Sequence, residues 1–295
     1  MPANQLLGVK MSDDNSTSLV NFGDLSKPAD TLIQKVSSAI SGVFEPWQIK
    51  RVAKAEAEVN LIKAKSEIEI TELHRRAMHR FVEEEANRQE NIEEITKKSI
   101  SHLKQESKPE QMEDDWITNF FDKSRIISDD EMQTLWAKVL AGEANSPGTY
   151  SKRTVNLLGD LDKKDALLFQ SLCRFGWLIG NFTPLVFDPQ AEIYNRVGIN
   201  FESLSHLNSL GLIQFNSIGG FSRQRLPKQF VVVYCGQPLA LSMQKDTDNN
   251  LNLGSVLLTQ AGRELASIIN APCVGGFADY VKEKWRAYLP EAQIS

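Results

Sequence analysis

The residues able to do chemistry are few in this chain and do not gather into a catalytic motif. Two of the four histidines, His74 and His79, lie five positions apart in an expected helix, about 140° around its axis, so they do not converge on a metal ion. Paired acids such as Asp129 and Asp130 stand at an expected helix start, where they cap free amides. The chain also lacks a P-loop, a dinucleotide-binding glycine loop and the usual hydrolase motifs. The sequence therefore predicts a protein that is not an enzyme and that binds no cofactor or metal.

The cysteines and the overall charge limit the expected cellular location and the expected kinds of binding partner. Cys173, Cys235 and Cys273 are odd in number, far apart and without a Cys-x-x-Cys pair, which predicts reduced thiols in a cytoplasmic protein. The net charge of −5 disfavours a wholly electrostatic nucleic-acid binder but leaves a local basic patch open. The first residues lack the pattern of a signal peptide, and the most apolar window, 167–182, is too short to cross a bilayer. We therefore expect a soluble protein that touches a membrane at most peripherally.

The stretch 128–144 predicts the central helix of the fold. Ser128 and Glu131 have the spacing of a capping box, which satisfies free amides at a helix start. Apolar residues then recur at steps of three and four, so they share one face of the helix. We expect this face to form the core of a helical module. It consists of Met132, Leu135, Trp136, Val139 and Leu140.

Residues 48–105 predict one long helix that projects as a stalk. No proline or glycine interrupts them, and a helix of this length reaches roughly 85 Å. The seam positions follow steps of three, four and four, an eleven-residue repeat typical of nearly straight helical bundles. Because a lone solvated helix of this kind is marginal, we expect oligomerisation, with two helices folded back on the C-terminal domain as the alternative. The residues predicted to carry self-association are Ile62, Ile70, Leu73, Phe81, Ile92 and Ile95.

Two charged residues interrupt this seam. Glu84 and Arg88 occupy positions where the repeat calls for apolar side chains. We therefore expect a break or a bend in the helix near residues 83–85.

Residues 26–44 predict a separate amphipathic helix. Its opposite face is small and polar, with only Lys27 and Lys35 as basic residues. Packing on the protein itself or on a neighbouring subunit is the first interpretation. Peripheral membrane contact is the second, although such helices usually carry a face rich in lysine and arginine. The apolar face for a membrane or a partner consists of Leu32, Ile33, Val36, Ile40, Val43 and Phe44.

The pattern changes in the second half of the chain. Residues 107–180 predict four helices in a compact all-α module, the last of them running to residue 179. After residue 181, a short helix at 200–210, β-rich segments and a helix at 259–269 predict a winged-helix-like α+β domain. Such a domain binds DNA or serves as a protein-docking module. The short helix contains no arginine or lysine, which disfavours reading of the major groove. The residues able to contact nucleic acid are Arg223, Arg225 and Lys228.

These patterns divide the chain into four parts. We expect a disordered tail at 1–25, the amphipathic helix and the coiled-coil-like helix at 26–106, the all-α module at 107–180 and the winged-helix-like domain at 181–295. The predicted fold class is mainly α with a small α+β part.

Several of these stretches resemble a bacterial family known as domain of unknown function 2806. They are Phe44–Glu58, Asp115–Asp122, Ser128–Ala144 and Ser151–Val155. A weaker similarity to the Abi-alpha family covers mainly 107–172, including the Leu-Asp-x-x-Asp-Ala-x-Leu-Phe string at 161–169. That second resemblance implies a role in abortive infection, in which infected bacteria stop growing or die. Neither resemblance implies catalytic residues.

The sequence therefore predicts a non-enzymatic, oligomeric interaction protein of bacterial phage defence. Its partner would be a phage or host protein. The alternatives are a DNA-binding regulator that uses the C-terminal domain and a peripheral membrane effector that uses residues 26–44.

Overall fold

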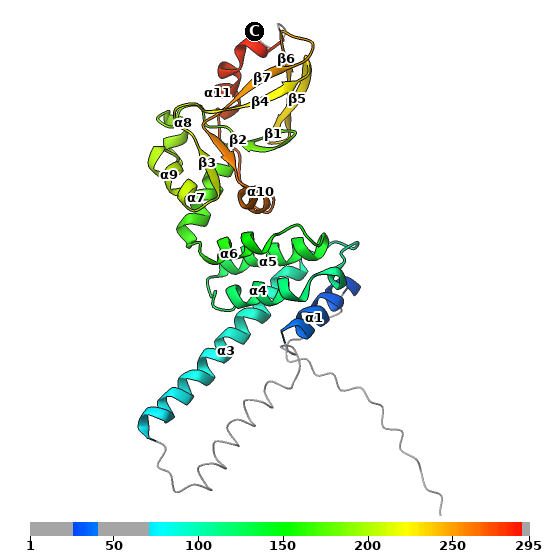
Figure 1. The fold of residues 1–295 in the computed structure, drawn as a ribbon, viewed down its shortest axis with the longest axis vertical. Coiled ribbons are helices and arrows are strands. Elements are labelled where there is room, and N and C mark those ends of the chain that lie inside the picture. Colours follow the sequence, from blue (N-terminus) through cyan, green and yellow to red (C-terminus); the bar gives the residue numbers. More distant parts are fainter. Residues whose placement is uncertain (1–25, 41–70, 291–295) are drawn as a thin grey trace, which may run out of the picture.

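The computed structural model describes residues 26–40 and 71–290. They form a layer of helices below a mixed α+β part, with one helix projecting from the layer (Figure 1). The predicted tail at 1–25 and the first part of the predicted stalk lie outside the described residues. The helices of the first half are α1 (Lys27–Ala39), α3 (Glu72–Ile100), the short 3-10 helix η1 (Pro109–Gln111), α4 (Asp114–Ser124), α5 (Asp130–Asn145), α6 (Lys152–Gly159) and α7 (Lys163–Cys173). We call α4 to α7 the central module.

The start of α5 corrects the predicted capping box. Asp129 is the N-cap, and its carboxylate accepts hydrogen bonds of 3.1 and 3.0 Å from the backbone amides of Glu131 and Met132. Ser128 therefore lies outside the helix. Aspartate and serine cap helices about equally well, so the position of the cap between two adjacent candidates is not fixed by residue type.

Glycine at position 142 permits a close contact inside α5. The ring of Tyr150 lies where a side chain at this position would stand, with its Cε2 atom 2.6 Å from an ideal Cβ on Gly142. The helix continues past the glycine to Asn145 and ends before Pro147, which cannot continue it.

The predicted apolar face of α5 forms the core of the central module. Trp136 and Leu140 are fully buried. The ring of Phe120 in α4 meets Trp136 edge-on at a centroid distance of 5.1 Å and stacks on Trp116 at 5.1 Å. The indole nitrogen of Trp116 donates a 2.7 Å hydrogen bond to the carbonyl of Tyr150, so the loop before α6 is tied to α4.

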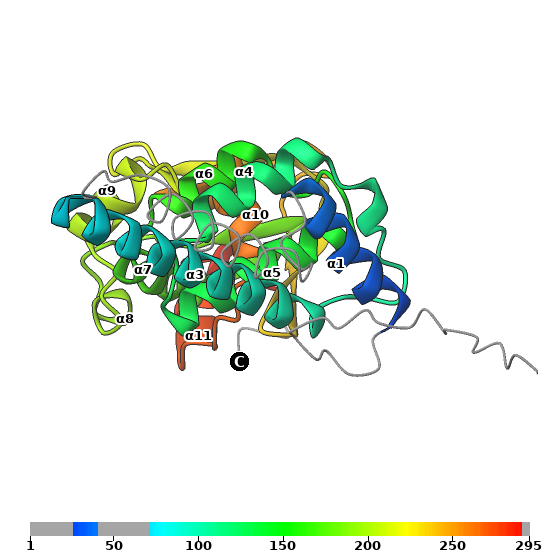
Figure 2. The same cartoon turned by 90° about the horizontal axis from the view of Figure 1, so that it is seen from below.

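Two N-terminal helices cover this module from below. The C-terminal half of α3 lies against α5 (Figure 2). There the Lys98 amine contacts the Asp130 carboxylate at 2.6 Å and the Gln133 side chain at 2.9 Å. Helix α1 packs on η1 and α4 and is joined to α4 by an ion pair of 2.6 Å between Lys35 and Asp114.

The second half of the chain is α+β. Its strands are β1 (Gly176–Ile179), β2 (Asn181–Pro184), β3 (Ile213–Phe215), β4 (Phe221–Leu226), β5 (Gln229–Tyr234), β6 (Gln237–Ser242), β7 (Asn249–Gly254) and β8 (Val256–Leu258). Its helices are α8 (Glu192–Asn195), α9 (Phe201–Ser209), α10 (Gln260–Ala266), α11 (Phe277–Lys284) and the 3-10 helix η2 (Arg286–Tyr288). Among the described residues the strands form a four-stranded sheet in the order β2-β1-β5-β6 and the antiparallel pairs β3–β8 and β4–β7. The expected mainly helical class with a small α+β part is confirmed at this level.

Aromatic side chains hold α11 on the four-stranded sheet. Trp177 of β1 stacks on Tyr234 of β5 with ring centroids 5.1 Å apart. Phe277 at the start of α11 meets Tyr234 at 5.4 Å, and Trp285 after its end meets Trp177 at 5.5 Å. The burial of these large rings accounts for the docking of α11 at both of its ends.

The helix predicted to run to residue 179 ends at Cys173. The chain then forms the β1–β2 hairpin, which turns at Gly180 with a φ of 74°. Gly176 is needed in β1 because an ideal Cβ there would lie 1.9 Å from the ring of Phe182. The apolar run 175–179 fits a buried strand as well as a helix, so periodicity could not decide between them.

The prediction of three reduced thiols is wrong for two of them. Cys235 and Cys273 form a disulfide, with Cα atoms 6.2 Å apart, while Cys173 is a free, buried thiol. The bridge joins the turn between β5 and β6 to the segment before α11. Spacing along the sequence could not show this, because the two cysteines meet only through the tertiary fold.

Candidate functional site

The N-terminal half of α3 projects from the central module (Figure 1). It carries exposed apolar side chains. Leu73 is 67% exposed and Phe81 is 58% exposed. With exposed Ala77 between them at steps of four, they lie on one face of the helix, and Met78, 40% exposed, lies beside them. Contiguous apolar surface of this kind marks protein–protein contact sites. We call these four residues the α3 stripe.

The charged residues beside the stripe pair with one another along the helix. Glu84 lies 3.4 Å from Arg80 and 3.7 Å from Arg88, and Arg88 also pairs with Glu85. These side chains are at least partly exposed, so they bury no unpaired charge. Helix α3 is continuous from residue 72 to residue 100, and the break predicted near residues 83–85 does not occur.

The other residues predicted to carry self-association are not exposed on the described part of α3. Ile92 and Ile95 are 8% and 0% exposed because they pack inside the chain's own core. This corrects the expectation that they contact another subunit. Ile62 and Ile70 lie outside the described residues. The structure therefore leaves Leu73 and Phe81 as the two predicted assembly residues that are exposed.

The three basic residues considered for nucleic acid do not form one patch of free charge. The guanidinium of Arg223 donates to the backbone carbonyl of Ile179, and Lys228 pairs with Asp246 at 3.0 Å. Arg225 is exposed and makes no hydrogen bond or ion pair within the described part of the chain. One free arginine offers little attraction for a phosphate backbone.

The apolar face of α1 packs on its own chain. Leu32 and Val36 are fully buried against the central module, and Ile33 and Ile40 are half-buried. This agrees with the first interpretation, packing on the protein itself, and corrects the alternative for Leu32 and Val36, which are not open to a membrane. Val43 and Phe44 lie outside the described residues. Within residues 26–40 and 71–290, no helix combines the length and the apolar character needed to cross a membrane.

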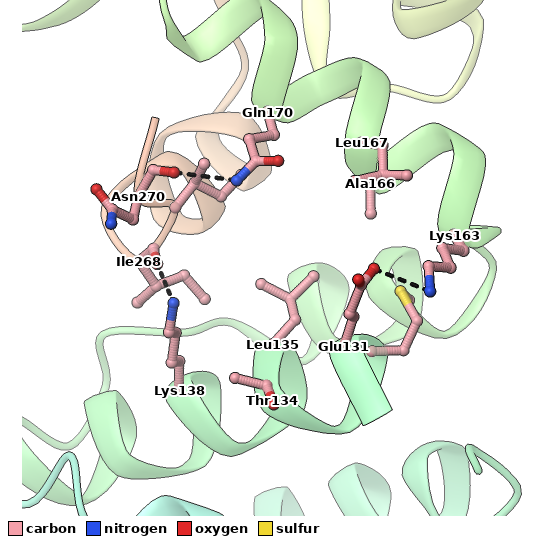
Figure 3. A pocket seen from close by; sticks show the side chains of 12 residues that line it. Glu131, Thr134, Leu135, Lys138, Lys163, Ala166, Leu167, Gln170, Ile268 and Asn270 are labelled. Carbon is pink, nitrogen blue, oxygen red and sulfur yellow. Dashed lines mark hydrogen bonds and ion pairs between the residues drawn. The ribbon is translucent and has the colours of Figure 1, made fainter. Parts of the chain in front are cut away.

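A cleft of about 280 Å³ opens between α5, α7 and the segment after α10 (Figure 3). Leu135 points into it from α5, Leu167 from α7 and Ile268 from the segment after α10. At one end the amine of Lys138 donates a 3.4 Å hydrogen bond to the carbonyl of Ile268. The cleft therefore has an apolar centre, and its lining contains no histidine, cysteine or serine that could act as a base or nucleophile.

The other end of the cleft is a fixed group of charges. The amine of Lys163 lies 2.9 Å from the Glu131 carboxylate and 3.0 Å from that of Asp129, and these bonds raise its pKa. The amide of Met132 and the neighbouring Lys163 lower the pKa of Asp129. Shifts in these directions keep both groups charged at neutral pH, whereas a general acid or base works best with a pKa near the working pH. This end of the cleft is suited to ion pairing and not to proton transfer.

The structure contains a histidine–carboxylate pair that the sequence patterns did not predict. The Nε2 atom of His206 in α9 lies 2.7 Å from the Asp165 carboxylate in α7. Asp165 also accepts a hydrogen bond from the amide of Asp162, so it caps its own helix while it contacts α9. Forty-one residues separate the pair, and no spacing rule links them. Among the described residues, no group of histidine, cysteine and acidic side chains is arranged to hold a metal ion.

The fold and these surfaces define a mainly helical α+β protein with a projecting helix. The family model "Protein of unknown function (DUF2806)" matches residues 75–282, which is most of the chain. The chain belongs to this family. No curated protein and no solved structure matches it. The family match begins within α3 at residue 75 and ends within α11 at residue 282, so it includes most of the projecting helix and most of the α+β part.

Proposed function

We propose that this protein is a non-enzymatic interaction protein that assembles with copies of itself through the α3 stripe. The observation that supports the proposal is the exposure of Leu73 and Phe81 on a helix that leaves the body of the molecule. Helices in proteins gain most of their stability by packing an apolar face. The projecting half of α3 is therefore only marginally stable on its own and would be stabilised by contact with another helix.

The pattern of the sequence favours a second copy as the partner. The steps of three and four that place Leu73 and Phe81 on one face begin earlier in the chain, at Ile62 and Ile70. A repeat of eleven residues matches a nearly straight bundle of like helices. The paired charges that flank the stripe keep the rest of the helix surface compatible with water.

We also propose that residues 181–295 form a winged-helix-like domain that docks protein. In this arrangement α9 precedes β3, the β3–β8 pair frames the long β4–β7 extension, and α10 follows. Helix α9 carries no arginine or lysine, and Phe201 on it is 58% exposed. These features favour contact with an apolar surface of a partner protein over binding in the major groove of DNA.

The biological setting that we propose is bacterial phage defence in the cytoplasm, with a phage or host protein as the partner. Its support is the resemblance of 107–172 to the Abi-alpha family. Assembly through α3 would then bring several copies of the C-terminal part together. Several weak docking sites on one particle bind a partner far more tightly than one site does.

Light scattering on the intact protein tests the assembly. The wild-type chain is compared with Leu73→Glu/Phe81→Glu and with Ile126→Glu as the control, because Ile126 is also an exposed apolar residue, at 66%, but lies in the loop between α4 and α5 and not in the α3 stripe. We expect a defined oligomer for the wild type and the control and a monomer for the double variant. A monomeric wild type, or an oligomer that survives the double substitution, contradicts the proposal.

Phage challenge tests the setting separately. Cells that express the wild-type chain should reduce the plaque count of at least one phage in a panel, and the double variant should lose that protection. Equal plaque counts for both, with light scattering as expected, would keep the assembly and refute its role in defence.

A further inference from the structure

A short segment joins the C-terminal part to the central module. Residues 268–276 connect α10 to α11 without helix or strand, and we call them the C-terminal strap. Three strap carbonyls accept hydrogen bonds from side chains on or just after helices of the module. The pairs are Lys138 to Ile268 at 3.4 Å, Gln170 to Asn270 at 3.0 Å and Arg174 to Pro272 at 3.2 Å. The strap also forms one wall of the cleft (Figure 3).

A disulfide holds the other side of the strap. Cys273 in the strap is bonded to Cys235, which lies in the turn between β5 and β6. Next to the bridge, the hydroxyl of Tyr234 accepts a 2.8 Å hydrogen bond from the amide of Val274 and donates a 2.9 Å bond to the carbonyl of Arg174. The bridge is the one covalent cross-link among the described residues, and the strap is otherwise held by these hydrogen bonds and by partly buried apolar side chains such as Ala271 and Val274.

Both residues of this bridge are exposed, in contrast to the third cysteine. Cys235 and Cys273 are exposed residues, whereas Cys173 is buried. Exposed disulfides are accessible to attacking thiolates and include the labile and regulatory ones, while buried thiols are inert. Burial raises the pKa of Cys173 to about 12, so this residue has little thiolate at neutral pH.

We propose that the Cys235–Cys273 bridge is a thiol–disulfide exchange site for dithiol reductants, and that its opening releases the C-terminal strap from the sheet. A thiolate of the reductant attacks Cys235, the bond between the two sulfurs breaks, and Cys273 leaves as a thiolate that takes up a proton. The second thiol of the reductant then displaces Cys235. The protein gains two electrons and two protons, and the reductant becomes a disulfide.

The geometry favours Cys273 as the leaving group. The guanidinium of Arg174 is bonded to the carbonyl of Pro272, the residue directly before Cys273. A nearby cation stabilises a thiolate, and a more stable thiolate leaves faster. Release of the strap would loosen the cleft wall at Ile268 and Asn270, while Phe277 keeps α11 on the sheet.

Thiol labelling of the native, full-length protein tests the chemistry. After oxidation with glutathione disulfide, N-ethylmaleimide should label no cysteine, because two are bonded and Cys173 is buried. After treatment with dithiothreitol under native conditions, it should label Cys235 and Cys273 only. Failure of the bridge to form with glutathione disulfide, or resistance of the bridge to dithiothreitol in the native protein, would overturn the proposal.

Hydrogen exchange followed by mass spectrometry tests the structural consequence. Reduction should speed exchange in peptides that cover residues 270–276 by about tenfold and leave β1 and β5 unchanged, as expected for local opening. Cys235→Ser should show the fast pattern without reductant, and Cys173→Ala should behave as the wild type. Equal exchange of the strap in the oxidised and reduced wild type refutes the release, and this comparison does not depend on the folding of any variant.

Discussion

The buried carboxylate of Glu143 accepts a 2.8 Å hydrogen bond from the backbone amide of Tyr150. Its other oxygen accepts a 2.6 Å bond from the amide of Gly148. Glu143 lies near the end of α5 and is 3% exposed, so both oxygens satisfy amides of the loop before α6. The residue thereby fixes the loop that places the Tyr150 ring against Gly142 and the Tyr150 carbonyl within reach of the Trp116 indole.

Substitution of Glu143 by glutamine should destabilise the central module. Glutamine keeps the shape of the side chain, but its amide group must face a backbone amide, where one donor meets another. We expect a loss of about 1–3 kcal/mol in the free energy of unfolding, measured by urea denaturation at neutral pH. Glu90→Gln, at an exposed position of α3, is the matched control and should change stability by less than about 0.5 kcal/mol. Equal stability of the two variants would show that the loop does not need the carboxylate.

The same residue should give the protein a pH-dependent stability. Burial raises the pKa of Glu143 above its usual value, and the backbone amides of Gly148 and Tyr150 offset this only in part. A carboxyl group with a raised pKa binds its proton more readily in the folded state than in the unfolded state. Its contribution is therefore complete below the unfolded pKa and is lost as the pH rises through the folded pKa. The stability difference between the wild type and Glu143→Gln should increase as the pH falls from 7 towards 4 in urea titrations, and a constant difference would contradict the assignment.

Trp136 tests the core of the central module. The ring is fully buried against Phe120, and its indole nitrogen has no hydrogen-bond partner in the described part of the chain. Trp136→Ala should cost about 3–5 kcal/mol because it leaves a large cavity. Trp136→Phe should cost markedly less, since it retains most of the apolar ring and removes a donor that forms no bond. Urea denaturation of both variants checks the order, and an equal cost would mean that the indole nitrogen has a partner such as water.

Local sequence patterns predicted the helices of this fold better than the tertiary contacts between its elements. The short helix predicted at 200–210 and the apolar face of α5 both follow from short-range spacing, and the structure has them. Short-range rules fail where two residue types are equivalent, as with Ser128 and Asp129 at the start of α5. They also fail where an apolar run is short, as at residues 176–179.

The candidate sites depended on contacts that spacing does not encode. Phe81 and Ile95 share one repeat along the chain, yet the first is exposed and the second is covered by α5. The repeat shows that a face needs burial but not whether the same chain supplies it. The bridge between Cys235 and Cys273 and the contact between His206 and Asp165 likewise form only when distant segments fold together.

The two halves of α3 should respond differently to the same change. Phe81→Glu introduces a charge at an exposed position, so the free energy of unfolding of the monomer should change by less than about 0.5 kcal/mol. Ile95→Glu places a carboxylate in a fully buried site without a partner and should cost more than about 3 kcal/mol or prevent folding. Urea denaturation at a concentration low enough to dissociate any oligomer separates these effects from assembly. A large loss of monomer stability in Phe81→Glu would mean that the projecting half of α3 packs on its own chain, and the stripe would then be part of the core.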